Sequence, residues 1–267
     1  MSVTPSWIFD APHYQAMTQA RLMFIKQFLP ELIRSKQLRT ALDTGCGVGE
    51  FSGFLSDMGL AVTGVDSRAT NIAEAQRRYP NLPFATYDIE GAEIGRLGTF
   101  DLVLCLGLLY HLENPMAALR NLHMLTSGVL LIESMIHPRA TLTLELVEEG
   151  TLEDQSMRSV ALVPSEPSFI KLLYRVGFSY VYSFRQLPDH EQFRVTRTSR
   201  RRRTFLIASH APLMLAACVL EPNPPSTGYW QRPYSARIFW LQQRLTRVFR
   251  AGQTRLFQLL GKGRVSG

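Results

Sequence analysis

A glycine-rich segment stands where an apolar stretch ends and a helical pattern begins; its residues are DTGCGVGE at 43–50. Gly45 and Gly47 lack a Cβ atom, so the backbone can turn tightly there and approach a ligand closely. The helix that follows has free N–H groups in its first turn. Asp66 ends the next apolar stretch, 21 positions after Gly45. A carboxylate in that place can accept two hydrogen bonds from ribose hydroxyls, so the spacing predicts a site for a nucleoside-containing ligand.

Two details separate this pattern from the dinucleotide fingerprint of NAD enzymes. The third glycine, Gly49, follows Gly47 by two residues, whereas the fingerprint places it three residues later. An acid, Asp43, also precedes Gly45 by two positions. If an aminoacyl tail, rather than a pyrophosphate, meets the helix start, we expect Asp43 to help hold the ammonium of that tail.

These segments resemble the class I S-adenosylmethionine-dependent methyltransferases over residues 38–211. The resemblance implies that the glycine-rich loop contacts the methionine part of the cofactor S-adenosylmethionine and that Asp66 holds the ribose. It also implies that Asp88, in ATYDIE, meets the adenine amino group and that Leu106 lies under the methionine. Arg21, in the N-terminal helical segment, matches the cationic contact that such helices give to the cofactor carboxylate.

The segment GLLYHLENP at 107–115 follows an apolar stretch whose carboxyl end should face the ligand crevice. Tyr110 and His111 are therefore the candidate catalytic residues. His111 could remove a proton from a hydroxyl or an amine as the methyl group moves. In-line methyl transfer can also be accelerated by positioning alone, so a structural role for His111 stays open. No cluster of Cys or His has the spacing of a metal site, and we expect no metal.

The segments at 107–115 and 162–181 resemble, more narrowly, the methyltransferases that finish wobble-uridine modification in bacterial tRNA. Similar segments occur in natural-product and glycan methyltransferases. This chain departs from the tRNA group because Leu-Glu, not basic residues, follows Tyr110-His111, and because we expect no large N-terminal extension. The primary hypothesis is therefore methylation of a hydroxyl, amine or activated carbon of a small-molecule or glycan-type acceptor. The alternatives are a tRNA methyltransferase and a non-catalytic cofactor-fold protein whose basic tail binds a partner.

Short apolar stretches alternate with helical patterns along most of the chain, which predicts an α/β fold with a doubly wound sheet. We expect seven strands, mostly parallel, in a Rossmann-like methyltransferase fold with an antiparallel final hairpin and a C-terminal helical extension. The expected strands are 39–43, 61–66, 84–87, 101–106, 129–133, 180–186 and 204–209. The expected helices are 13–36 with an interruption at Pro30, 50–58, 70–79, 116–125 and 169–176.

Composition changes divide the chain into four parts. Residues 1–37 are expected to form an N-terminal helical cap, and 38–211 the cofactor-binding domain, in which 137–165 form a substrate-side insertion. Residues 212–233 are interpreted as a linker, because an apolar connector up to Leu220 is followed at 221–233 by a stretch rich in Pro and turn formers. Residues 234–267 show apolar positions on one helical face with arginines elsewhere, which predicts a basic amphipathic helix.

Charge is unevenly distributed, because residues 191–267 have a balance of +12 within a total of +7. A basic tail favours a polyanionic neighbour, either an anionic membrane surface or RNA. It could equally be a solvated face, or pack on the core or on a second subunit in a homodimer. Three scattered cysteines favour a reducing compartment. We therefore expect a cytoplasmic protein, with peripheral membrane association left open.

Overall fold

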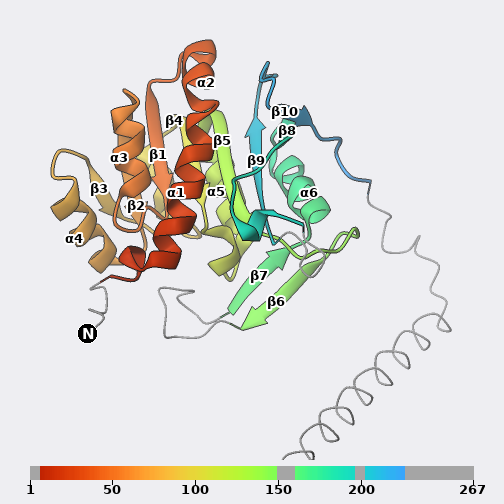
Figure 1. Ribbon diagram of the computed structural model, residues 1–267, viewed down its shortest axis with the longest axis horizontal. Helices are drawn as coiled ribbons and strands as arrows, with labels where there is room; N and C mark the ends of the chain where they lie inside the picture. The colour runs from red at the N-terminus through yellow and green to blue at the C-terminus, as the bar shows by residue number, and fades with distance from the viewer. Residues whose placement is uncertain (1–6, 149–159, 196–201, 226–267) are drawn as a thin grey trace, which may run out of the picture. The chain divides into compact units, whose positions relative to one another are not determined.

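The computed structural model describes residues 7–148, 160–195 and 202–225. Its described elements belong to one unit, residues 1–224, and the predicted C-terminal helix at 234–267 lies outside the described residues. The centre of this unit is an eight-stranded sheet with the order β10-β8-β9-β5-β4-β1-β2-β3 (Figure 1). Its strands are β1 (Thr40–Thr44), β2 (Ala61–Asp66), β3 (Phe84–Thr86), β4 (Phe100–Leu106), β5 (Thr126–Met135), β8 (Tyr180–Phe184), β9 (Arg203–Ser209) and β10 (Cys218–Leu220).

The strands β1 to β5 are parallel to one another. The strand β9 runs antiparallel to both of its neighbours, β5 and β8. The predicted final hairpin is confirmed, because β8 and β9 pair antiparallel. The expected number of strands was seven, and the structure adds an eighth, β10, which pairs antiparallel with β8 at the edge of the sheet. β10 is only three residues long and ends the apolar run at 213–220, which lacks the alternation of a strand, so the sequence does not mark it.

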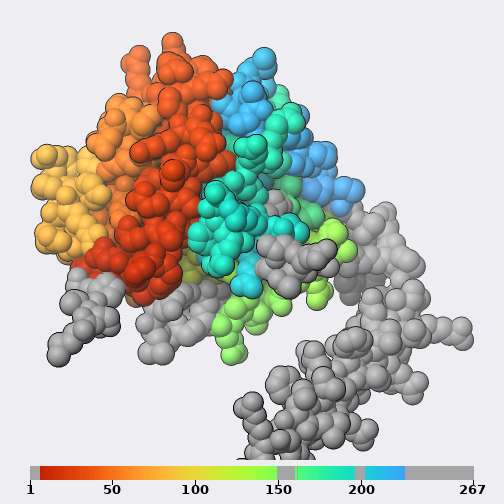
Figure 2. Space-filling model, viewed as in Figure 1, coloured from red at the N-terminus to blue at the C-terminus, as the bar shows by residue number. Residues whose placement is uncertain are grey.

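Helices cover both faces of the sheet, and the alternation of side chains along β4 shows how. Leu102 and Leu104 belong to the core cluster that contains residues of α1 (Pro12–Lys26), α2 (Leu29–Lys36) and α3 (Glu50–Asp57). Val103 and Cys105 belong to the cluster that contains residues of α5 (Pro115–Leu125) and α6 (Glu166–Val176). Successive strand residues point to opposite faces, so one apolar strand supplies both cores. In the space-filling view, α1 and α2 (red) form a continuous strip on the near face (Figure 2).

The helix boundaries follow the predicted ones within a few residues. α1 ends at Lys26 and α2 begins at Leu29, so the expected interruption near Pro30 is confirmed, with Pro30 in the first turn of α2. The remaining elements are α4 (Ala69–Arg78) and the short 3₁₀ turns η1 (Ile8–Asp10), η2 (Ala92–Leu97), η3 (Leu109–His111) and η4 (Glu191–Phe193).

The expected insertion at 137–165 contains a separate two-stranded antiparallel sheet, β6 (Leu144–Glu148) and β7 (Val160–Pro164). β7 contacts η3, so this hairpin lies beside Tyr110 and His111. A substrate-side position of this insertion stays a prediction.

The apolar run that follows the basic cluster at 200–203 contains a strand of the sheet. Every residue of β9 is buried, as expected for the stretch 204–209. In the part of the chain that the structure describes, no helix combines the length and apolar character that a bilayer crossing requires.

Candidate functional site

A cavity of about 330 Å³ opens at the carboxyl ends of β1, β2 and β4. Such ends are where open parallel α/β sheets bind ligands. Gly45, Asp66, Asp88 and Leu106 line it, as do Tyr110 and His111. The structure therefore brings four of the six predicted cofactor-side residues and both predicted acceptor-side residues to one cavity, whereas Asp43 and Gly47 are not part of its lining.

The glycine-rich loop is fixed to β2 by backbone hydrogen bonds. The N–H groups of Gly45 and Cys46 both donate to the carbonyl oxygen of Val65, at 2.8 and 2.9 Å. Gly45 has φ +68° and Gly47 has φ +54°, a region that side chains disfavour. A Cβ atom on Gly47 would stand 2.9 Å from the Phe9 ring, so this glycine also permits a close approach.

Asp66 ends β2 and joins the loop to the start of α4. Its Oδ2 accepts a hydrogen bond from the N–H of Gly47 at 3.0 Å. Its Oδ1 accepts from the N–H of Arg68 at 2.9 Å and from the Asn71 amide at 3.2 Å. The carboxylate lies on the cavity wall and is held in one orientation by these donors, as a ribose-binding acid requires.

Asp43 occupies a different place from the one expected for an ammonium-binding acid. Its side chain is 2% exposed, is not part of the cavity lining, and accepts a 2.7 Å hydrogen bond from the Ser52 hydroxyl. Burial raises the pKa of Asp43 to about 6, although the Ser52 hydrogen bond opposes the shift. In the structure the Asp43 side chain therefore joins the end of β1 to α3.

The two remaining predicted cofactor-side residues, Asp88 and Leu106, also line the cavity. Asp88 follows β3 and is exposed at the mouth, where its carboxylate accepts from the N–H of Glu90 at 2.9 Å. Leu106 ends β4 and is buried at the base. Gly107 follows with φ +74°, and a Cβ atom there would stand 2.9 Å from Arg21 Nη2. The absence of a side chain at Gly107 thus lets Arg21 reach the end of β4.

A buried charge network of Arg21, Glu133 and Arg203 adjoins the cavity, and only Arg21 was predicted from the sequence. Glu133, at the end of β5, is fully buried and accepts hydrogen bonds from Arg21 Nη2 at 2.5 Å and from Arg203 Nη1 at 3.0 Å. Two guanidinium groups share one carboxylate, so the network has a net charge of about +1. An acid at the end of an otherwise apolar strand was the available signal for Glu133; Arg203 gave no signal beyond its basic cluster.

Tyr110 and His111 belong to η3, and their ring centroids lie 4.0 Å apart. Arg203 Nη2 donates to the Tyr110 hydroxyl at 2.9 Å, and its guanidinium carbon stands 4.7 Å from the Tyr110 ring centroid. Arg203 therefore fixes the orientation of Tyr110 through a hydrogen bond and a cation–π contact.

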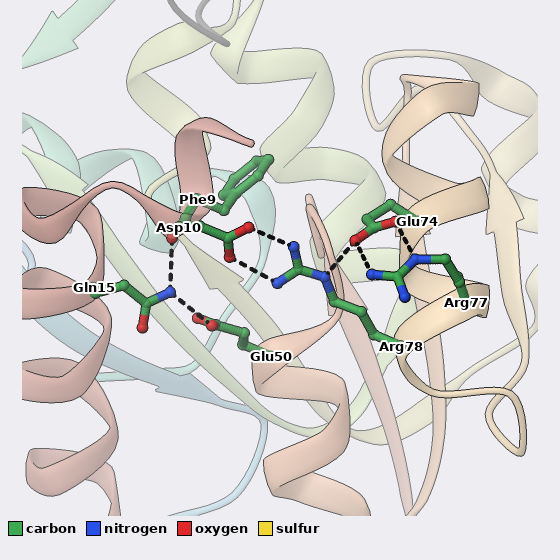
Figure 3. A network of polar contacts seen from close by, with 7 residues as sticks. All are labelled: Phe9, Asp10, Gln15, Glu50, Glu74, Arg77 and Arg78. Atoms are coloured by element: carbon green, nitrogen blue, oxygen red, sulfur yellow. Dashed lines mark hydrogen bonds and ion pairs between the residues drawn. The ribbon is translucent and has the colours of Figure 1, made fainter. Parts of the chain in front are cut away.

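Aromatic residues from the N-terminus complete the cavity wall. Phe9 of η1 and Tyr14 of α1 both line it, and neither was a predicted site residue. Polar contacts around Phe9 connect η1 with α3 and α4 (Figure 3). Nothing in the local sequence pattern marks Phe9, because its position over the loop depends on how α1 packs.

The cavity fits a nucleoside that carries an aminoacyl tail. Arg21 Nε is buried, and among the described residues it has no hydrogen-bond partner, while Arg21 itself lines the cavity. A carboxylate is the natural partner for such a donor. The sheet order, the loop after β1 and the acids after β2 and β3 define the Rossmann-like methyltransferase fold, a class of nucleoside-binding α/β protein.

Comparison with known families agrees with this geometry. The family model described as a methyltransferase domain matches residues 14–183, which is more than half of the chain. The chain therefore belongs to this family, within the class I methyltransferases that use S-adenosylmethionine.

Similar proteins and structures cover the fold to different extents. A ubiquinone biosynthesis O-methyltransferase of Albidiferax ferrireducens is 32% identical over 84 residues, which are 30% of this chain and 33% of that protein. A tRNA U34 carboxymethyltransferase of Pseudomonas savastanoi pv. phaseolicola is 29% identical over 154 residues, which are 54% of this chain and 46% of that protein. The chain thus spans less than half the length of these relatives. The crystal structure of the N-terminal domain of EvdMO1 with SAH bound shares the fold, with a TM-score of 0.55, 20% identity, and coverage of 72% of this chain and 79% of that one.

Proposed function

We propose that this chain transfers a methyl group from S-adenosylmethionine to a hydroxyl, amine or activated carbon of a small-molecule or glycan-type acceptor. The observation that supports this most is the shared cavity: the glycine-rich loop and Asp66 line the same space as Tyr110 and His111. A donor and an acceptor bound there would be in contact, and proximity supplies much of the acceleration of an in-line displacement.

Three charged groups have roles on the donor side of this proposal. Asp66 would hold the ribose hydroxyls, Asp88 the adenine amino group, and the unpartnered Nε of Arg21 the carboxylate of the tail. When bound, S-adenosylmethionine supplies an electrophilic methyl group. The glycine-rich loop would admit the aminoacyl part, because Gly45 presents backbone only.

On the acceptor side, His111 would take the proton that leaves a hydroxyl or an amine. Arg203 and Glu133 hold Tyr110 beside it, so Tyr110 has a fixed position for contacting the acceptor. The β6–β7 hairpin adjoins η3 and would supply part of the acceptor surface.

The charges around the cavity support a neutral or cationic acceptor. Its lining has an excess of acidic side chains, which are Glu50, Asp66, Asp88, Glu90 and Glu113. A polyanion would approach these carboxylates unfavourably. The relative from Albidiferax ferrireducens, an O-methyltransferase, supports a hydroxyl as the acceptor group.

A tRNA acceptor is the second candidate, and the relatives that modify tRNA U34 support it. Its test is binding of bulk tRNA at increasing salt. A tRNA-modifying enzyme should bind RNA with an affinity that falls steeply as salt rises, because phosphate contacts release counterions. Absent or salt-insensitive binding would exclude this candidate.

Calorimetry with S-adenosylhomocysteine tests the primary proposal. We expect one site per chain, and about 10- to 100-fold weaker binding by the Asp66→Ala variant, because hydrogen bonds to a charged group are lost. Asp57→Ala is the matched control, since Asp57 is an exposed acid on α3 outside the cavity lining. The proposal is wrong if the unchanged chain does not bind, or if both variants bind equally well. Transfer of labelled methyl groups to phenols, amines and glycosides would then identify the acceptor class.

The basic segment 234–267 carries the remaining proposals, a peripheral membrane contact and a homodimer. Flotation with anionic liposomes, with and without this segment, tests the first, and equal recovery would contradict it. Sedimentation of the two forms tests the second in the same way.

A further inference from the structure

The short turn η1 lies directly on the glycine-rich loop. Phe9, its central residue, lines the cavity, and its ring occupies the space that a side chain on Gly47 would need. The turn therefore covers the loop that the proposed function assigns to the cofactor. Phe9 also packs edge-on against Tyr14, with ring centroids 5.9 Å apart, so the two aromatic side chains form one wall.

η1 has little packing of its own to keep it in this place. It is three residues long, none of them is buried, and its first turn has no side-chain cap. It joins α1 through Ala11, whose extended backbone, φ −65° and ψ +140°, breaks the helical path. A segment with so few apolar contacts opens at a low free-energy cost unless other groups restrain it.

Polar side chains provide the restraint (Figure 3). Arg78, at the end of α4, donates to both carboxylate oxygens of Asp10, at 2.9 and 2.8 Å. Gln15 Nε2 donates to the carbonyl oxygen of Phe9 at 2.7 Å and to Glu50 at 2.9 Å. A bidentate arginine–carboxylate pair fixes direction as well as distance, so Asp10 holds the orientation of its neighbour Phe9.

The Arg78 side chain is also fixed by a second residue of α4, Glu74. Its Nε donates to Glu74 Oε1 at 2.8 Å, and the Glu74 side chain is only 7% exposed. The same helix begins at Ala69, three positions after Asp66, and its Asn71 also lines the cavity. The Asp10–Arg78 pair thus joins the N-terminal turn to the helix that follows Asp66 in the chain.

We infer that Phe9 is a cofactor-contacting residue and that the Asp10–Arg78 ion pair is a latch that holds η1 closed over the bound cofactor. The inference depends on the proposed function, because it takes the cavity as the S-adenosylmethionine site. Release of the cofactor then requires the ion pair to break and the turn to swing at Ala11. Asp10 and Arg78 act through Phe9 and are positioning residues.

The test measures how fast labelled S-adenosylmethionine leaves the unchanged chain and its variants when excess unlabelled S-adenosylhomocysteine is added. Asp10→Asn and Arg78→Gln should each release it about tenfold faster, because each removes a charge-assisted bidentate pair. The double variant should be no faster than either single one, since both remove the same contact. High salt should accelerate release from the unchanged chain and have little effect on the double variant.

Arg77→Gln is the matched control. Arg77 is the neighbour of Arg78 on α4 and also binds Glu74, but it makes no bond to Asp10, and its side chain is 71% exposed. Its release rate should stay within about twofold of the unchanged chain. If Arg78→Gln does not fold, Asp10→Asn alone decides, because that change leaves α4 intact.

Equal release rates for the unchanged chain and Asp10→Asn would overturn the latch, as would equal acceleration by Arg77→Gln and Arg78→Gln. Phe9→Leu tests the contact itself and should weaken binding with the latch present. Failure of the unchanged chain to bind labelled cofactor would instead contradict the proposed function, so the two ideas fail in distinguishable ways.

Discussion

Glu133 is the residue whose replacement should affect stability most. It is fully buried, and its carboxylate is shared by Arg21 and Arg203, each of whose side chains is about 10% exposed. Glu133→Gln preserves the shape of the side chain but leaves two buried guanidinium groups facing a neutral amide. Removing one partner of a buried ionic network costs about 3–5 kcal/mol, and we expect a loss of this size in the free energy of unfolding at pH 7.

The pH dependence of this loss gives a second measurement. Burial by itself would raise the pKa of Glu133, but the charges of Arg21 and Arg203 outweigh it, so the pKa is held below its usual value. The carboxylate therefore stabilises the fold above the ordinary glutamate pKa of about 4.3, and this stabilisation is lost as the pH falls through the lower pKa of the folded state.

Urea unfolding of the unchanged chain and of Glu133→Gln from pH 7 to pH 3 is the assay. The difference in unfolding free energy should be largest near neutrality and shrink below about pH 4. Glu93→Gln is the control, because Glu93 forms an exposed pair with Arg96 and should have little effect at any pH. A difference below about 1 kcal/mol at pH 7, or one that is constant across the pH range, would refute the reasoning.

Three further changes have defined outcomes. Asp43→Asn should gain stability relative to the unchanged protein as the pH rises from about 4 to about 6, because burial raises the pKa of Asp43 to about 6 in the fold and the unfolded chain therefore ionises first over this range; urea unfolding at about pH 4 and pH 7 measures the difference, and a difference that does not change with pH contradicts the prediction. Gly47→Ala should weaken S-adenosylhomocysteine binding at least about tenfold in calorimetry, since φ is +54° and the new methyl group meets Phe9. His111→Ala should reduce methyl transfer more than cofactor binding, and unchanged turnover would assign His111 a structural role.

The fold was largely predictable because its signals are local. Apolar strands and amphipathic helices repeat along the chain, and most boundaries agree with the expected ones within a few residues. The glycine-rich loop and Asp66 were predictable for the same reason: they follow consecutive parallel strands, whose carboxyl ends must meet at one edge of the sheet. β10 was not, since three residues at the end of a uniformly apolar run give no periodicity.

Tertiary structure decided the direction of individual side chains and the long-range ion pairs. The sequence placed Asp43 beside the loop, but only the packing of α3 turned its carboxylate toward Ser52 and away from the cavity. Glu133 bonds to Arg21 across 112 positions, and Arg78 bonds to Asp10 across 68. Such pairs form wherever two elements happen to pack, and they leave no pattern at short range. The sequence alone therefore determined most of the sheet, the loop and the cofactor class, whereas the structure determined which acids pair with the arginines and that Phe9 lies over the loop.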